Sequence, residues 1–323
     1  MGSAHPRATK TRHGSIREPI APISETTSAM GGRLAVHIAS TDAVRAGRDA
    51  QRVLARMCHW GDRLSRHLDT SELSRLNAAP GSEVLVGPTL AAALAAGASA
   101  QRLGDGLVDV TLLDERLAAE GLLAARSHGP ASGRWSVTPD LRRGAVVQRP
   151  AGLRFDLGGI AKGWLADRAL ALLTSWPSVV IDADGDLAIR GASGQRWEVA
   201  VDDPRAAEAT LAILHLDAQD DGWPSRWGVA TSGTSVHRWH RDGRVRHHLI
   251  DPRTRQPAVT DIIQATVICA TALQAEAFAK ATVIAGSHDG LTRLERAGVD
   301  GAVILTERHE TLALPGTLAL LAA

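Results

Sequence analysis

Tyrosine is absent from the 323 residues of this chain, and phenylalanine and cysteine occur twice each. Cys58 and Cys269 lie in apolar segments without the spacing of metal ligands, so we expect two buried reduced thiols rather than a disulfide or a metal pair. No apolar run approaches the roughly 18 residues that a membrane-spanning helix needs. The net charge of +1 and the lack of a basic block argue against a nucleic acid or an anionic membrane as partner.

Lysine is also scarce: arginine supplies nearly all of the 36 basic residues. Lysine occurs only at Lys10, Lys162 and Lys280, and the last two lie in short segments where an alanine precedes the lysine. A residue that departs from the composition of the chain carries slightly more information than one that follows it. Positions 162 and 280 are therefore the first candidates for a functional role.

The composition is otherwise that of a folded globular protein, with 44% hydrophobic and 22% charged residues. The length allows one large domain or two ordinary ones. The first 24 residues are polar, contain proline and lack a hydrophobic segment, which favours a flexible tail over residues 1–27 rather than a signal peptide. We therefore expect a cytoplasmic protein in which residues 28–323 form one domain.

Helix-like and strand-like segments alternate irregularly along this domain. Apolar positions at helical spacing predict helices over residues 41–67, 88–103, 113–126, 160–170 and 271–286. Alternating or continuous apolar runs predict strands over residues 34–40, 144–149, 152–157, 178–184, 186–191, 196–203, 209–217 and 262–270, and a final strand–turn–strand over 301–314. Residues 236–252 are typical of a hairpin that turns at Asp242-Gly243. This mixture predicts an α+β fold with mixed, mostly antiparallel sheets and packed helices.

The stretch RFDLGGIAKGWLADRAL, residues 154–170, joins a strand-like run to a helix through two glycines. Asp156 ends the run, Gly158 and Gly159 allow a tight turn, and Lys162 follows in the first helical turn. A helix that begins after glycines is a ready site for an anion, and a lysine there adds charge. The spacing is neither that of a dinucleotide fingerprint nor that of a Walker A loop. From the glycines alone, an ordinary strand–helix turn with a surface lysine is the simpler interpretation.

Four further segments are ambiguous when each is taken alone. SELSRLN (71–77) has leucines at helix-face spacing, and ATSGTS (230–235) is a turn of small residues after a strand. HHLIDPRT (247–254) places a histidine beside an Asp-Pro turn, in a chain with 13 histidines. AEAFAKA (275–281) sets Glu276 and Lys280 four residues apart, a spacing typical of a surface ion pair.

Taken together and in this order, these segments resemble one family, the FAD:protein FMN transferases, also called ApbE flavin transferases. The segments that carry the resemblance, from about residue 30 to residue 286, are AMGG, SELSRLN, LVDVTLL, FDLGGIAKGWLADRA, VATSG, HHLIDPRTRQPA and AEAFAKA. The resemblance implies a domain of two interlocked subdomains. It also implies transfer of FMN from FAD to a threonine hydroxyl of a target flavoprotein, with release of AMP.

The family motifs imply a role for particular residues of this chain. His248 corresponds to the base that accepts the proton of the attacking hydroxyl, although the adjacent His247 leaves an ambiguity. The small residues Thr231, Ser232 and Gly233 would form part of the wall of the site. The residues implied to bind FAD are Met30, His67, Val108, Asp109, Val110, Asp156, Lys162, Thr231, Ser232 and Ile250.

Three departures from the family pattern bear on function. His67 stands where an aromatic ring, commonly tyrosine, covers the flavin. DADGD (182–186) replaces N-A-G-G-D and adds a carboxylate. The resemblance also implies a magnesium ion, whose ligands would be at Gly159, Glu276 and Lys280. At the last of these positions lysine replaces a threonine ligand. A protonated lysine has no lone pair for a metal, so we expect its ammonium to substitute for the ion, unless Glu276 and Lys280 form a surface pair.

Three functions stay open on the sequence. The chain is a flavin transferase, a FAD pyrophosphatase that produces FMN and AMP, or a flavin-binding protein with weak catalysis. The acceptor protein and the oligomeric state are not encoded in any motif.

Overall fold

The computed structural model describes residues 10–11, 14–17, 22–123, 134–140, 144–206, 208–219, 221–222, 224–236, 238–241, 244–314 and 317. An antiparallel eight-stranded sheet is its centre, with the strand order β19-β18-β17-β12-β9-β8-β4-β3. The strands are β3 (Ile23–Ala29), β4 (Gly32–Ile38), β8 (Val179–Ala183), β9 (Asp186–Gly191), β12 (Ser225–Gly233), β17 (Ile262–Cys269), β18 (Gly301–Thr306) and β19 (Thr311–Ala313). The predicted α+β class is confirmed.

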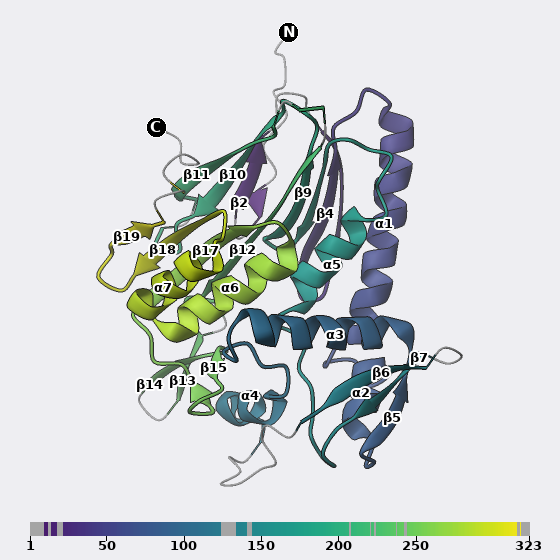
Figure 1. Cartoon of the computed structure of the whole chain (residues 1–323), viewed down its shortest axis with the longest axis vertical. Coiled ribbons are helices and arrows are strands. Elements are labelled where there is room, and N and C mark those ends of the chain that lie inside the picture. The colour runs from purple at the N-terminus through teal and green to yellow at the C-terminus, as the bar shows by residue number, and fades with distance from the viewer. Residues whose placement is uncertain are drawn as a thin grey trace.

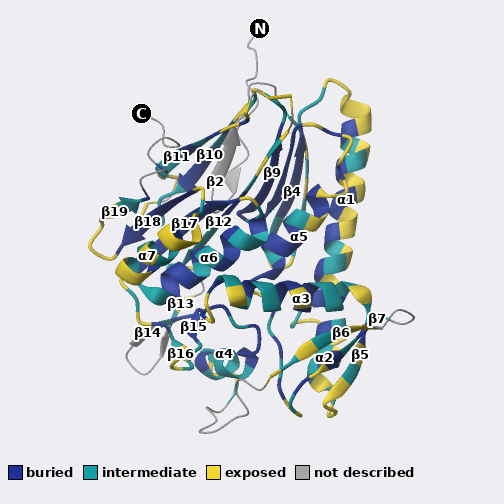
Figure 2. Ribbon diagram, in the orientation of Figure 1, coloured by how far each residue is buried: buried dark blue, intermediate teal, exposed yellow. Residues whose placement is uncertain are grey.

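Both faces of this sheet are covered, which explains why its central strands are nearly continuous apolar runs. Val179 and Ile181 of β8 face a core shared with the helices, whereas Val180 faces a second core. The second core lies against β10 (Arg196–Asp202) and β11 (Thr210–Asp217), which form a smaller sheet with β1 (Lys10–Thr11) and β2 (Gly14–Arg17). The central strands are accordingly buried along their length (Figure 2).

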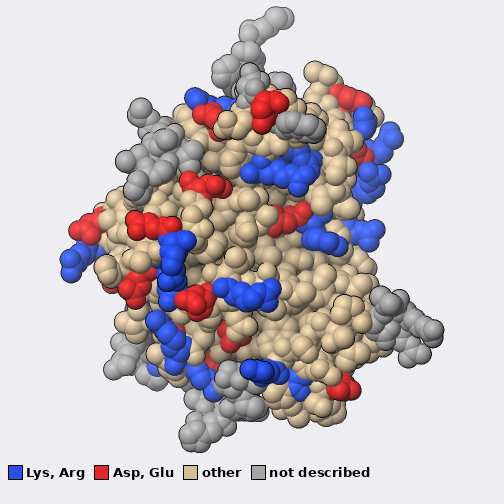
Figure 3. All heavy atoms as spheres, viewed as in Figure 1, with Lys and Arg blue, Asp and Glu red and all other residues tan. Residues whose placement is uncertain are grey.

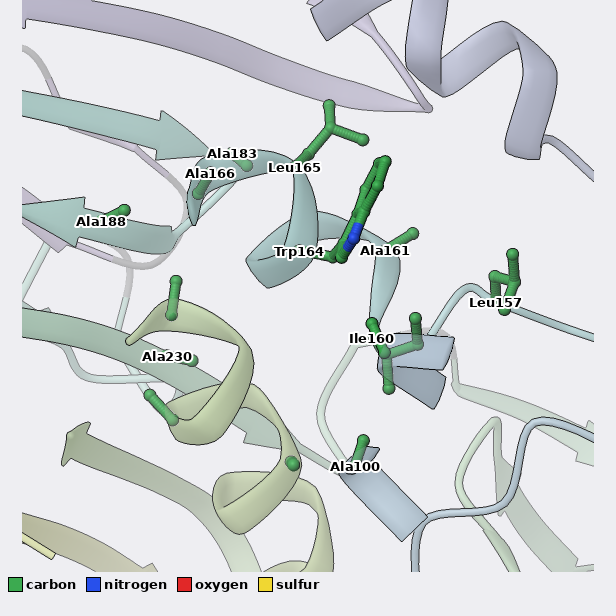
Figure 4. Close-up of a cluster of buried hydrophobic side chains, with 14 of the residues drawn as sticks. Ala100, Leu157, Ile160, Ala161, Trp164, Leu165, Ala166, Ala183, Ala188 and Ala230 are labelled. Carbon is green, nitrogen blue, oxygen red and sulfur yellow. The ribbon is translucent and has the colours of Figure 1, made fainter. Parts of the chain in front are cut away.

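Four helices cover the other face of the large sheet (Figure 1). They are α1 (Ala43–Leu64), α5 (Ala161–Leu170), α6 (Ala272–Ala285) and α7 (Ser287–Ala297). Side-chain oxygens cap two of them: Asp42 accepts a 3.0 Å hydrogen bond from the Arg45 N–H, and Thr271 accepts one of 3.2 Å from the Gln274 N–H. Trp164 and its neighbours in α5 belong to a buried cluster that also includes alanines of the sheet and Ala100 of α3 (Figure 4). Small residues there let α5 lie close to the sheet.

A second group of elements lies below α3 (Pro88–Leu103) in Figure 1. It contains α2 (Glu72–Ala78), α4 (Leu113–Glu120) and a sheet of β5 (Glu83–Val86), β7 (Gly144–Gln148) and β6 (Ser136–Asp140). Two short ladders complete the fold: β13 (Arg238–Arg241) with β14 (Arg244–His247), and β15 (Ile250–Asp251) with β16 (Gln256–Pro257). The first ladder is the predicted hairpin, whose Asp242-Gly243 turn lies outside the described residues.

Several predicted boundaries were wrong. The helix expected to reach residue 126 ends at Glu120, because Gly121 adopts the left-handed conformation with φ 80°. Residues 152–157 form no strand, and the Phe155 backbone instead bonds to the Asn77 side chain. The tail expected through residue 27 ends earlier, since Ile23–Ala29 pair with β4. The helix α7, at residues 287–297, was not predicted. The division into two interlocked subdomains stays a prediction.

No helix in the described part of the chain combines the length and the apolar character needed to span a bilayer. On the face seen in Figure 3, positive and negative side chains are interspersed. That distribution agrees with the near-zero net charge of the sequence.

Candidate functional site

A pocket opens where α4, β15 and α6 approach one another, below the central sheet in Figure 1. Its walls come from the loop after α3, the glycine turn before α5, the segment leading into β15, and one face of α6. It brings together eight of the residues implicated by sequence: Val108, Asp109, Val110, Asp156, Gly159, His248, Ile250 and Lys280. The cavity volume is ≈ 50 Å³. Space of this size holds a few water molecules, so it suits one small group of a larger ligand.

Asp156 is held in this pocket by hydrogen bonds and ion pairs, including one of 3.9 Å between its Oδ2 and the Nε of Arg66. Its N–H donates to the Val110 carbonyl at 2.7 Å, and its Oδ1 accepts the Gly158 N–H at 2.9 Å. Its Oδ2 lies 3.3 Å from the Nη1 of Arg116, which also donates through Nε to Glu120 at 3.0 Å. The glycine turn thus presents a carboxylate that is already paired.

Arg116 is a pocket residue that sequence reasoning missed. Its spacing of four residues from Glu120 is that of an ordinary pair on a helix surface, so nothing local marks it. Only the packing of α4 against the glycine turn brings this guanidinium to the pocket.

The N-terminus of α5 was expected to offer its first N–H groups to an anion. In the structure the Ile160 and Ala161 N–H groups donate to the Leu157 carbonyl, at 3.0 and 2.9 Å. The Gly163 N–H donates to the Glu276 carboxylate at 2.9 Å. These three donors are therefore occupied by the protein itself. Glycine is required at 163 because a Cβ there would lie 2.7 Å from the Ala272 carbonyl oxygen.

Lys162 lies beside the pocket rather than in its wall. Its Nζ is 3.1 Å from Asp184 Oδ2, and Asp186 is close by. Burial lowers the pKa of Lys162, but the carboxylates of Asp186, Asp184 and Glu276 outweigh burial and raise it above 10.5. The lysine is therefore charged at neutral pH, and an anion bound there would compete with Asp184.

The two adjacent histidines have different surroundings. His247 is buried: its Nε2 is 3.0 Å from the Ala258 carbonyl, and its Nδ1 accepts the Leu249 N–H at 3.3 Å. Burial lowers the pKa of His247, which keeps it neutral. His248 lies in the pocket wall near Asp109 and Lys280. The geometry therefore favours His248 over His247 for chemistry in the pocket.

Besides Lys162 and Glu276, five residues implicated by sequence lie outside the pocket wall. Met30 occupies the β3–β4 turn with φ 56° and packs on Gly61 of α1, and His67 is exposed. Thr231 on β12 hydrogen-bonds to Thr266 through the two hydroxyls, at 2.8 Å. Ser232 and Gly233 follow it on the same strand. None of these five contributes to the pocket, so a ligand that met all of the predicted residues would extend well beyond it.

The three positions expected to hold magnesium do not fit a divalent cation. Lys280 places its ammonium against Gly159, where a Cβ would overlap it. Glu276 is only 5% exposed, and its Oε2 already accepts the Gly163 N–H. Among the described residues, no three histidine, cysteine or acidic side chains are grouped to hold an ion. The burial of Glu276 also contradicts the alternative of a surface Glu276–Lys280 pair.

The fold is that of solved flavin transferases. The crystal structure of the ApbE protein from Thermotoga maritima matches with a TM-score of 0.78 and 22% identity, over 94% of this chain and 100% of that one. The apo form of the Pseudomonas stutzeri flavinyl transferase ApbE matches with a TM-score of 0.71 and 23% identity, over 98% and 99%. At these identities the likeness establishes the architecture.

The sequence places the chain within a family. The ApbE family model matches residues 30–304, most of the chain, and the chain belongs to this family. A FAD:protein FMN transferase from Treponema pallidum is 32% identical over 189 residues, which cover 52% of this chain and 50% of that protein. A protein of the same name from Salmonella typhimurium is 30% identical over 161 residues, covering 48% and 43%. The chain thus spans about half the length of the curated relatives that it matches.

Proposed function

We propose that this chain is a FAD:protein FMN transferase. FAD is the donor, a threonine hydroxyl of a target flavoprotein is the acceptor, and AMP is released. Membership of the ApbE family and the names of its relatives support the reaction class. The observation that carries the proposal is the pocket, which gathers a candidate base, His248, with two cations, Arg116 and Lys280.

The arrangement suits phosphoryl transfer, in which the protein contributes positioning and charge stabilisation. The acceptor oxygen forms a bond to the phosphorus of the FMN half as the pyrophosphate P–O bond breaks. His248 accepts the hydroxyl proton, and the electron pair of the broken bond leaves with AMP. Arg116 and Lys280 stabilise the negative charge on the pyrophosphate oxygens. A positioned base of this kind typically contributes about 10²–10⁴-fold in rate.

Several finer features remain predictions. The acceptor threonine and a cytoplasmic address come from the sequence and its resemblance. The residues implied to contact FAD at positions 30, 67, 162, 231 and 232 are not among those that line the pocket. They describe where the rest of the dinucleotide is proposed to extend.

The test is to incubate the purified protein with FAD and an acceptor flavoprotein, and to follow AMP and the flavin by chromatography and mass spectrometry. AMP formed together with flavin bound covalently to the acceptor supports the transferase. Free FMN with AMP would instead identify a pyrophosphatase. Bound FAD without AMP would identify a flavin-binding protein and refute the proposal.

A further inference from the structure

Lys280 is one of three lysines in the chain, and its place in the pocket is unusual. It lies on α6 one turn after Glu276, so both side chains leave the same face of the helix. That face meets the glycine turn before α5. Gly159 has no side chain there, and any Cβ at that position would overlap the Lys280 ammonium. The ammonium therefore occupies the space between the α6 face and the glycine turn.

The surroundings of this ammonium are acidic on one side and open to the pocket on the other. Burial lowers the pKa of Lys280, while Glu276, Asp156 and Asp186 oppose the effect and Arg116 reinforces it. Burial likewise raises the pKa of Glu276, with Lys280 opposing. The described part of the chain gives the Lys280 ammonium no ion-pair partner, whereas Arg116 is paired with Asp156 and Glu120. Lys280 is thus the pocket cation left to meet an anionic ligand.

The same space is unsuitable for a divalent metal. Magnesium requires near-octahedral oxygen ligands at about 2.0–2.1 Å, and an ammonium supplies hydrogen bonds but no lone pair. An ammonium is also a compact point charge, while the planar fork of arginine is broader. Lysine rather than arginine is the residue that can occupy so small a gap in an otherwise arginine-rich chain.

We propose that the Lys280 ammonium is the built-in cation of this site, and that the FAD pyrophosphate binds against it without a divalent metal. This inference rests on the proposed function for the identity of the ligand. It adds that a fixed side chain supplies, together with Arg116, the positive charge opposite the pyrophosphate. Affinity for FAD is then set by the protein and not by the concentration of magnesium.

The experiment is calorimetric titration of the purified full chain with FAD, in EDTA and in millimolar Mg²⁺. The proposal expects the two dissociation constants of the unmodified protein to agree within about threefold. Lys280→Met keeps most of the length of the side chain and removes its charge. It should weaken FAD binding by about tenfold or more in both buffers, as expected for loss of a charge-assisted hydrogen bond. Lys280→Thr should weaken binding in EDTA and regain it with Mg²⁺, because the smaller hydroxyl leaves room for an ion.

Arg52→Met is the matched control, because it removes one positive charge from the exposed side chain of Arg52, which pairs with Asp49. It should leave FAD affinity unchanged, and circular dichroism verifies that each variant is folded. FAD binding that strengthens tenfold or more with Mg²⁺ in the unmodified protein would overturn the inference while leaving the proposed function intact. That titration decides the question even where a variant fails to fold. Absence of FAD binding in both buffers would refute the proposed function itself.

Discussion

Replacing Asp182 by asparagine tests the electrostatics of the DADGD turn. Asp182 is fully buried at the end of β8, where its Oδ1 accepts the Gly185 N–H at 2.8 Å. Its Oδ2 lies 3.5 Å from Arg33 Nη2, and neither of these atoms has a hydrogen-bond partner among the described residues. Burial raises the pKa of Asp182 from 3.8 to about 6, and the Gly185 N–H and Arg33 only partly oppose it.

The raised pKa fixes the sign of the pH effect. The folded state holds the Asp182 proton more tightly than the unfolded state does. The stabilisation of the folded state by this bound proton is therefore fully present below pH 3.8 and is lost as the pH rises through about 6. The difference between the pKa of Asp182 in the unfolded and in the folded state corresponds to a loss of roughly 3 kcal/mol in the free energy of unfolding at neutral pH. Asp182→Asn keeps an oxygen for the Gly185 N–H and removes the buried charge. We expect the variant to be about 1–3 kcal/mol more stable than the unmodified protein at neutral pH.

Urea unfolding of both proteins at several values between about pH 4 and about pH 7 measures this directly. The difference between the two curves isolates Asp182, because the other titrating groups are common to both proteins. The advantage of the variant should shrink toward zero near pH 4. A difference that does not change with pH, or a variant less stable than the unmodified protein at neutral pH, would refute this account of the turn.

Three other substitutions test the site and its support. His248→Ala should retain FAD binding and lose about 10²–10⁴-fold in transfer rate, measured as AMP release, and an unchanged rate would exclude it as the base. Lys162→Ala should weaken FAD affinity with the fold intact, whereas unchanged affinity in a titration would leave Lys162 a structural partner of Asp184. Asp167 accepts the Ala272 and Leu273 N–H groups at 2.9 and 3.0 Å, so Asp167→Ala should lower the free energy of unfolding by about 2–4 kcal/mol. Urea denaturation checks this, with Asp167→Asn expected to lose less; equal stability of all three proteins would show that these bonds contribute nothing.

Local sequence patterns predicted many of the helices and strands, because the formation of these elements depends largely on residues that are neighbours in sequence. The apolar runs at residues 178–184 and 186–191 predicted β8 and β9, and the helix after the glycine turn begins where it was expected. The pattern failed where a tertiary contact replaced a local one. Residues 152–157 have a strand-like composition, yet the Phe155 backbone bonds to the side chain of Asn77, 78 positions away, instead of to a strand.

The candidate site likewise has features that follow from local sequence and features that depend on tertiary packing. The sequence by itself determined the family motifs, the glycine turn and the candidate residues Asp156, His248 and Lys280, since each is visible in a short segment. Only the tertiary structure decided that Arg116 joins them, that His247 is tied to the backbone, and that Lys280 occupies the space over Gly159. The physical reason is that charge and hydrogen bonding act through space. The environment of an ammonium or an imidazole depends on which distant segments pack against it, and no spacing along the chain specifies that.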